Sequence, residues 1–381
     1  MSQWKIPLFK MHYDENDGRK VLSVLKRGMY WGLSSETIEL EKKVAEKTDR
    51  KYCVVFNSAT SALHALMISY KFSNRDEIIL PSFTFIASSN SVMFVNATPR
   101  FADIEDSTYG LDPHDVESKI TKKTKAIMPV HYAGNICKIN EIRKIASDYK
   151  LTLIEDAATA LGSKINGKSG GSFGDASVIS FAWNKIITSG EGGAAVTDSR
   201  KIYEDLIRIR SHGRIDTENY FMSANSSDYT SLGYNWRMSA MTAALGISQI
   251  DKLEKLIKMR NNNAAYLTKL LSNVQTIESP VISNDRKSNF MLYTVKVREG
   301  RRKRDELHSF MTKKGIQTKI IYEPIHLTSF YRRKFGYKKG LLKNTERIAD
   351  KILSLPMYPH LKKTEMNYII ESIKEFFERE G

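Results

Sequence analysis

The chain has 381 residues, 41% of them hydrophobic and 27% charged, and its 59 lysines and arginines outnumber 43 aspartates and glutamates to give a net charge of +16. This composition excludes a disordered or fibrous protein, and the length favours two domains over one. The positive charge favours anionic partners, but no helix-turn-helix, zinc-knuckle or RRM signature accompanies it, so we expect no nucleic acid. Most single lysines are expected on solvated faces, and some of the charge could attract a phosphorylated small molecule.

Short apolar runs alternate with helical patterns through the first two-thirds of the chain. The predicted strands cover 52–56, 77–80, 99–104, 126–130, 151–154, 176–181 and 194–197. The predicted helices between them cover 61–70, 86–95 and 139–150. Repeated strand–helix alternation predicts an α/β fold, with a mostly parallel sheet that is flanked by helices on both faces.

The last third of the chain has a different pattern. A long helical pattern covers 239–272, with interruptions expected at Gly246 and at 261–263. It is followed by predicted strands at 290–297 and 317–322 and by predicted helices at 304–314, 344–352 and 365–380. With a boundary near 252–258, we expect a large domain of residues 1–255 and a small C-terminal α+β domain of residues 256–381.

The first ten residues lack the basic start and apolar core of a signal peptide. The most apolar windows, 52–70 and 78–95, are interrupted by polar residues, so neither predicts a membrane span. Two cysteines, Cys53 and Cys137, indicate no disulfide framework. We therefore expect a cytoplasmic protein with no membrane partner.

A lysine and an aspartate each follow a predicted strand. Lys185 comes after strand 176–181, and Asp156 ends the run that begins with strand 151–154. A lysine amine forms a Schiff base with the aldehyde of pyridoxal phosphate (PLP), and an aspartate pairs with its ring nitrogen. Alone, either residue would be ordinary, but together they predict a PLP site. No His/Cys cluster accompanies Asp156, so we expect no metal.

Three further segments could contact such a cofactor. In 57–63 a strand ends and a helix begins, and free N–H groups with the Thr60 hydroxyl could bind a phosphate, although ordinary capping has the same pattern. In 81–85 an aromatic side chain follows a strand end, where open α/β sheets bind ligands. Ser180 could donate to a phosphate near Lys185, and the glycines of 190–193 lack the spacing of a dinucleotide site.

These segments occur in an order that resembles the DegT-type sugar-nucleotide aminotransferases. The matching segments are 58–63, 81–85, 155–158, 180–193, 233–239 and 355–359. The resemblance implies a fold type I PLP-dependent transferase, the aspartate aminotransferase fold, which works as a homodimer with shared active sites. It implies that Lys185 is the Schiff-base lysine and proton shuttle and that Asp156 pairs with the ring nitrogen. It implies the cofactor contacts Phe85 on the ring face and Ala59, Thr60, Ser180 and the partner subunit's Asn235 on the phosphate.

Three positions depart from the family's usual pattern. Ala59 stands where glycine is usual, and Thr159 stands where a Gln, Glu or His contacts the cofactor. Trp183 is expected to reshape the substrate pocket. Deoxygenating relatives replace the lysine with histidine, so Lys185 favours amino transfer.

The resemblance implies transfer of an amino group from L-glutamate, which leaves as 2-oxoglutarate, to a nucleotide-linked keto-deoxysugar. The sequence around Lys185, residues 184–193, resembles the perosamine-type branch more than the C3-aminating branch. This resemblance implies amination at C4 in deoxyaminosugar and lipopolysaccharide biosynthesis. Tyr322 and His326 resemble a family segment near the substrate, although His326 could equally be a loop histidine. The alternatives are a PLP-dependent sugar dehydratase or amino acid lyase, and a nucleic-acid-binding regulator.

Overall fold

The computed structural model describes residues 4–214 and 228–379, and its largest element is a seven-stranded sheet. The strands lie in the order β1-β9-β8-β5-β4-β2-β3. Their bounds are Tyr52–Phe56 (β1), Glu77–Pro81 (β2), Thr98–Ala102 (β3), Thr124–Ile127 (β4), Thr152–Asp156 (β5), Ala176–Ser180 (β8) and Gly193–Thr197 (β9). β8, β5, β4, β2 and β3 run parallel, whereas β9 runs antiparallel to both β8 and β1. The predicted mostly parallel sheet is confirmed.

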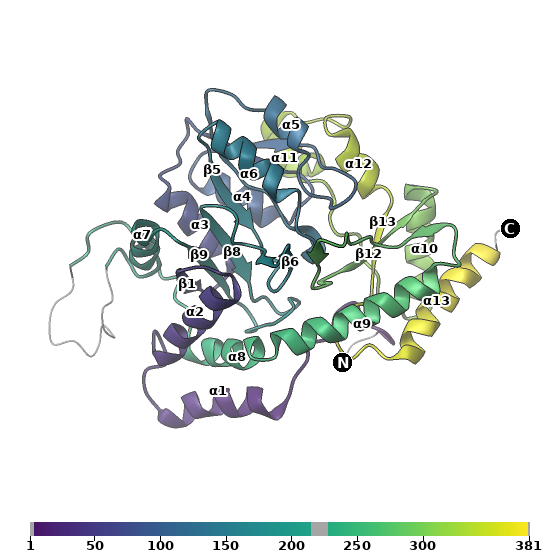
Figure 1. The fold of residues 1–381 in the computed structure, drawn as a ribbon, viewed down its shortest axis with the longest axis horizontal. Coiled ribbons are helices and arrows are strands. Elements are labelled where there is room, and N and C mark those ends of the chain that lie inside the picture. Colours follow the sequence, from purple (N-terminus) through teal and green to yellow (C-terminus); the bar gives the residue numbers. More distant parts are fainter. Residues whose placement is uncertain (1–3, 215–227, 380–381) are drawn as a thin grey trace.

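Helices cover both faces of this sheet, as predicted (Figure 1). In β1, Val54 belongs to the cluster on one face and Val55 to the cluster on the other, because successive side chains of a strand point to opposite faces. The first face packs against α3 (Ala59–Ser69), α4 (Ile86–Phe94) and α7 (Arg200–Arg210). The second packs against α2 (Ser35–Lys47), α5 (Pro113–Ser118), α6 (Ile139–Asp148) and α8 (Ala240–Ile250), and α1 (Glu15–Arg27) packs on α8. No helix in the described ranges is long and apolar enough to span a membrane.

A smaller antiparallel sheet follows in the last third of the chain. It contains β10 (Ile277–Glu278), β12 (Tyr293–Val297) and β13 (Ile352–Leu355). Its hydrophobic cluster includes side chains of α9 (Leu253–Leu271), α10 (Arg301–Lys313) and α13 (Lys363–Glu378). The remaining elements are the ribbon β11 (Arg286–Lys287), β6 (Lys164–Ile165) and β7 (Lys168–Ser169), and the helices α11 (Ser329–Phe335) and α12 (Lys343–Ala349).

Helix α9 belongs to both parts of the molecule. Leu253 and Leu256 pack in a cluster of the large sheet, whereas Ala264 and Leu267 pack in the cluster of the small sheet. Figure 1 shows α9 extending from α8 toward α13. One helix therefore bridges two cores, and the expected domain boundary inside 252–258 stays a prediction.

The expected breaks in the long helical pattern are wrong. The pattern divides between Ile250 and Leu253, not at Gly246 or 261–263. Gly246 lies inside α8 and permits this helix to pack closely on α2. A Cβ added at this position would come 2.9 Å from a Leu40 methyl group. Asn263 in α9 donates to the Tyr358 carbonyl at 2.9 Å, so the asparagine joins the helix to the C-terminal part of the chain.

The predicted strand at 317–322 is also wrong, since this segment forms only an isolated bridge between Lys319 and Ser354. It is instead held by the chain's first described residues. Gln317 N–H donates to the Ile6 carbonyl at 2.9 Å, and Leu8 N–H donates to Gln317 Oε1 at 2.9 Å. The N-terminal segment therefore lies beside 317–322, and the two reach the same cavity.

Candidate active site

A cavity of about 530 Å³ opens at one edge of the large sheet. The carboxyl ends of β2, β5 and β8 meet there, because these strands run in the same direction. Segments 8–9 and 317–323 form another wall. The lining contains these predicted site residues: Ala59, Thr60, Phe85, Asp156, Thr159, Ser180, Trp183, Lys185 and Tyr322. The structure therefore brings together every predicted residue except Asn235 and His326.

Asp156 ends β5 and is nearly buried, with 6% of its surface exposed. Its Oδ1 accepts a hydrogen bond from Ala158 N–H at 3.1 Å, and its Oδ2 accepts one from the Ser88 hydroxyl at 2.6 Å. Both carboxylate oxygens therefore have fixed directions. A buried, oriented carboxylate is what a protonated pyridine nitrogen requires as its partner.

Lys185 lies on the turn between β8 and β9. The turn is held by hydrogen bonds from Lys185 N–H to the Ala182 carbonyl and from Ser189 N–H to the Phe181 carbonyl, each 3.0 Å. Burial lowers the pKa of the Lys185 amine, although Asp156 and Glu191 partly oppose that shift. A lowered pKa increases the neutral amine, which is the form that attacks an aldehyde.

The first turn of α3 faces the same cavity. Ser58 caps the helix by accepting from Ser61 N–H at 3.0 Å, and Ala59 and Thr60 follow as the first helical residues. Gly193 of β9 allows this approach, because an added Cβ would come 2.3 Å from the Ala59 nitrogen. Ser180 pairs with Gly193 across the sheet. The start of α3 and Ser180 thus lie on either side of Gly193. The N–H groups of the helix start and the Ser180 hydroxyl are suited to binding a phosphate.

Aromatic side chains form the rest of the wall. Phe85 precedes α4 and is 59% exposed, with its ring centroid 6.1 Å from that of Tyr322. Trp183 is also exposed and meets Phe9 edge to face at 6.0 Å. Phe83, by contrast, is fully buried in the core.

The structure gives Thr159, His326 and Asn235 different surroundings from the other predicted residues. Thr159 lines the cavity, but its hydroxyl donates to the His131 carbonyl at 2.5 Å. His326 is fully buried between the Ser82 hydroxyl at 2.8 Å and Glu346 Oε1 at 3.1 Å, and it does not line the cavity, so its placement does not support the predicted substrate contact.

Asn235 is exposed and lies outside the cavity of its own chain. Its backbone pairs with Ser211 in an isolated bridge. A residue that serves the site of a second subunit has to lie outside its own, so this position is compatible with the predicted role.

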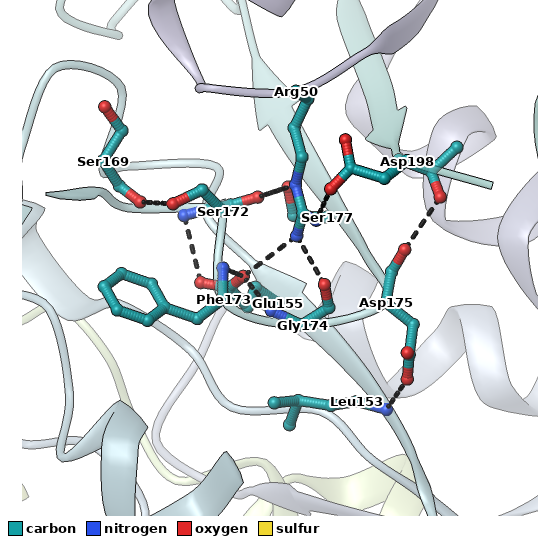
Figure 2. Close-up of polar contacts among 12 residues, drawn as sticks. Arg50, Leu153, Glu155, Ser169, Ser172, Phe173, Gly174, Asp175, Ser177 and Asp198 are labelled. Carbon is teal, nitrogen blue, oxygen red and sulfur yellow. Dashed lines mark hydrogen bonds and ion pairs between the residues drawn. The ribbon is translucent and has the colours of Figure 1, made fainter.

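A polar network behind Asp156 was missed by the sequence analysis. Glu155 is fully buried and accepts hydrogen bonds from three N–H groups, those of Gly171 at 3.0 Å and of Phe173 and Gly174 at 2.7 Å (Figure 2). His131 Nε2 lies 2.8 Å and Arg50 3.6 Å from the same carboxylate.

Burial alone would raise the pKa of Glu155, but the contacts with His131, Gly174 and Arg50 outweigh it and lower that pKa. Because Glu155 precedes Asp156 on β5, the network fixes the end of the strand. Arg50 and His131 lie far from Glu155 in the sequence, so no local pattern could have indicated the network. Among the residues that the structure describes, no group of three His, Cys, Asp or Glu side chains could hold a metal ion.

Comparisons with known proteins agree with this geometry. The model of the DegT/DnrJ/EryC1/StrS aminotransferase family matches residues 12–374. The chain is 33% identical to the GDP-perosamine synthase of Escherichia coli O157:H7 over 89% of each chain, and 34% identical to a pleiotropic regulatory protein of Geobacillus stearothermophilus over 94% of each.

Solved structures of sugar aminotransferases share the fold. Helicobacter pylori PseC, an aminotransferase involved in pseudoaminic acid biosynthesis, has a TM-score of 0.91 and 30% identity over 98% of this chain and 99% of that one. The PLP form of a putative sugar aminotransferase from Streptococcus pneumoniae has a TM-score of 0.92 and 25% identity over 98% of this chain and 99% of that one. The cavity fits the cofactor, since it is lined by the half-buried Lys185, the buried Asp156 and the first turn of α3. The chain belongs to the DegT/DnrJ/EryC1/StrS aminotransferase family, and pyridoxal phosphate is its cofactor.

Proposed function

We propose that the protein transfers an amino group from L-glutamate to C4 of a nucleotide-linked keto-deoxysugar and releases 2-oxoglutarate. The observation that carries this proposal is the meeting of Lys185 and Asp156 in one cavity with space for a substrate. The relatives named GDP-perosamine synthase support the sugar class and position C4.

The residues of the cavity divide the work. When bound, pyridoxal phosphate supplies an aldehyde that captures amines and a ring that withdraws electrons. Lys185 Nζ takes the proton from the Cα of glutamate and, in the return half-reaction, delivers a proton to C4 of the sugar. One base serves both positions, so no separate acid is required. Asp156 would pair with the protonated ring nitrogen, Phe85 would contact the ring, and the N–H groups of Ala59 and Thr60 would hold the phosphate.

Lys319 supports glutamate as the donor. It is the single lysine or arginine besides Lys185 among the described residues that line the cavity. Its side chain is exposed and forms no ion pair with the described part of the chain. A dicarboxylate donor requires a cation in the site, and Lys319 is available to bind a carboxylate of glutamate.

The aromatic wall supports a sugar as the acceptor. Trp183, on the same turn as Lys185, meets Phe9 edge to face, and Tyr322 lies beside Phe85. Aromatic rings supply apolar area with little conformational entropy to lose, which suits the C–H faces of a hexose. A reaction on such a substrate belongs to deoxyaminosugar biosynthesis, including lipopolysaccharide, and we propose the cytoplasm as its compartment.

Asn235 supports a homodimer with shared active sites. It lies outside its own cavity, on a segment with the stacked rings of Tyr234 and Trp236, whose centroids are 3.9 Å apart. Two-fold symmetric dimers are the commonest soluble homo-oligomers, and each of two symmetric subunits would give Asn235 to the other's phosphate site.

The deciding experiment incubates the purified protein with pyridoxal phosphate, L-glutamate and a panel of 3-keto and 4-keto nucleotide sugars. Mass spectrometry and NMR then identify the product, with Lys185→Ala as the inactive control. The proposal expects an amine at C4 and one equivalent of 2-oxoglutarate. An amine at C3 would contradict the position. Loss of water without gain of nitrogen would favour the dehydratase, and duplex binding without turnover would favour the regulator.

A further inference from the structure

Two buried hydroxyl groups lie behind Asp156. The Ser88 hydroxyl is 2.6 Å from Asp156 Oδ2, and the Thr84 hydroxyl is 2.9 Å from the Ser88 hydroxyl. Ser88 is fully buried and Thr84 nearly so. None of the sequence motifs indicated a role for either side chain.

The directions of these hydrogen bonds follow from counting protons. Ser88 has one hydroxyl proton and three acceptors in reach: Asp156 Oδ2 at 2.6 Å, the Thr84 hydroxyl at 2.9 Å and the Phe85 carbonyl at 3.1 Å. The charged acceptor at the shorter distance forms the stronger bond, so Ser88 donates to Asp156. Thr84 then donates to Ser88. The result is a chain of two hydroxyl groups that points at the carboxylate and in which each bond strengthens the next.

The same turn also presents Phe85 to the cavity. Thr84, Phe85 and Ser88 lie at the junction between β2 and the first turn of α4 and all three line the cavity, and the Ser88 hydroxyl is hydrogen-bonded to Asp156. One short segment thus sets the ring-stacking side chain and the direction of the counter-charge together. Ala158 N–H holds the other carboxylate oxygen at 3.1 Å.

We propose that Ser88, supported by Thr84, is a positioning residue that keeps the Asp156 carboxylate turned toward the ring nitrogen of pyridoxal phosphate. The inference rests on the proposed role of Asp156. The hydrogen bond holds the carboxylate in the direction that the ring nitrogen needs, so its loss weakens the ion pair and the ring nitrogen gives up its proton at a lower pH.

The test compares Ser88→Ala with Ser88→Thr, which keeps a hydroxyl group. Ser91→Ala is the matched control, because Ser91 is buried on the same helix and donates only to the Ser88 carbonyl, at 2.8 Å. The main readout is the ¹⁵N NMR shift of ring-labelled cofactor across a pH series, with the cofactor dissociation constant and kcat against KM beside it. A hydrogen bond to a charged group contributes about tenfold to an equilibrium.

In Ser88→Ala we therefore expect the ring nitrogen to lose its proton about one pH unit lower than in the wild type. We also expect the cofactor to bind about tenfold more weakly and kcat to fall about tenfold, with KM changed less than about twofold. Ser88→Thr restores these values, and Thr84→Val gives a smaller shift in the same direction.

Asp156→Asn separates the two levels of the proposal. If Asp156→Asn moves the ring-nitrogen signal and Ser88→Ala does not, the role of Ser88 is overturned and that of Asp156 stands. If neither variant moves the signal, the role proposed for Asp156 fails as well. Equal effects of Ser88→Ala and Ser91→Ala would reduce Ser88 to ordinary helix packing and overturn the inference.

Discussion

Lys185 has to be held in one place and its amine has to be uncharged to react, whereas the amine of an exposed lysine is mobile and protonated at neutral pH. Its burial lowers the pKa, and the turn between β8 and β9 holds its backbone. The cavity thus favours the reactive form of the lysine before any cofactor arrives.

The unloaded protein should therefore capture pyridoxal phosphate faster than a surface lysine does. The rate should rise with pH through a pKa below the ordinary lysine value of 10.5, because a lowered pKa releases the proton earlier. Stopped-flow absorbance across pH measures this, and borohydride reduction followed by peptide mapping should find the label on Lys185. Lys201→Ala, at an exposed position, is the control. A label on another lysine would refute the assignment.

Lys319 gives a prediction about the donor alone. Replacing it with methionine removes the charge and keeps most of the length, so the KM for L-glutamate should rise about tenfold, as for one lost charge-assisted hydrogen bond. The KM for the sugar nucleotide should change less. Lys319→Arg should restore much of the affinity, and Lys313→Met, at an exposed position on α10, is the matched control. An unchanged KM would show that another group binds the donor.

At the scale of elements, the contact between β9 and the start of α3 depends on one missing side chain. Gly193→Ala puts a Cβ 2.3 Å from the Ala59 nitrogen, so the start of α3 has to move away from β9. Such overpacking destabilises a protein by about 1–3 kcal/mol. We expect the dissociation constant of pyridoxal phosphate to rise at least about tenfold, since 1.4 kcal/mol is tenfold. Pyridoxal without the phosphate should lose much less affinity. Gly32→Ala, which meets nothing within 4 Å, is the control, and equal losses for both ligands would contradict the phosphate role of α3.

The Glu155 network gives a prediction about pH. The pKa of Glu155 is lower in the folded protein than its ordinary value of 4.5, so its contribution to stability is complete above about pH 5 and is lost as the pH falls through the folded pKa. Glu155→Gln should be less stable at pH 7 by about 3–5 kcal/mol, because it takes the buried carboxylate away from His131 and leaves Arg50 with its ion pair to Asp198. Urea unfolding from pH 7 to pH 4 should give a flatter profile for the variant. If stability fell equally with pH in the wild type and in Glu155→Gln, an ionised Glu155 would not be the source of the pH dependence.

Sequence alone could predict the elements whose signals are local. Strands 52–56 and 77–80 are apolar runs that end in small or polar residues, and they are found as β1 and β2. The segment 317–322 has strand-forming residues at 320–322, but the chain's N-terminal segment holds it by hydrogen bonds, which no local pattern records. The same reason separates Lys185 and Asp156, which follow strands and match a family motif, from Ser88 and Arg50, whose importance depends on partners far along the chain.

At the scale of the whole molecule, Asn235 allows a test of shared sites. Lys185→Ala and Asn235→Ala chains should each have low activity as separate dimers. In a mixed dimer, one of the two sites should contain both an intact Lys185 and an intact Asn235, so activity should recover toward half of the wild-type value per dimer, by the geometry of two-fold symmetry. Co-expression with two different tags isolates the mixed dimer. Absence of recovery in verified mixed dimers would assign Asn235 to its own subunit or to neither.

The walls of the cavity come from distant parts of the chain: Phe9 and Phe85 in the first quarter, Asp156 nearer the middle, and Tyr322 in the last quarter. During synthesis, a nascent chain that stops before 317–323 has the lysine and its aspartate but lacks the wall that confines them. It also lacks Gly315 and Gln317, which hold the N-terminal segment in place. The cavity that encloses Lys185 therefore cannot close until segment 317–323 has been synthesised and has met segment 8–9.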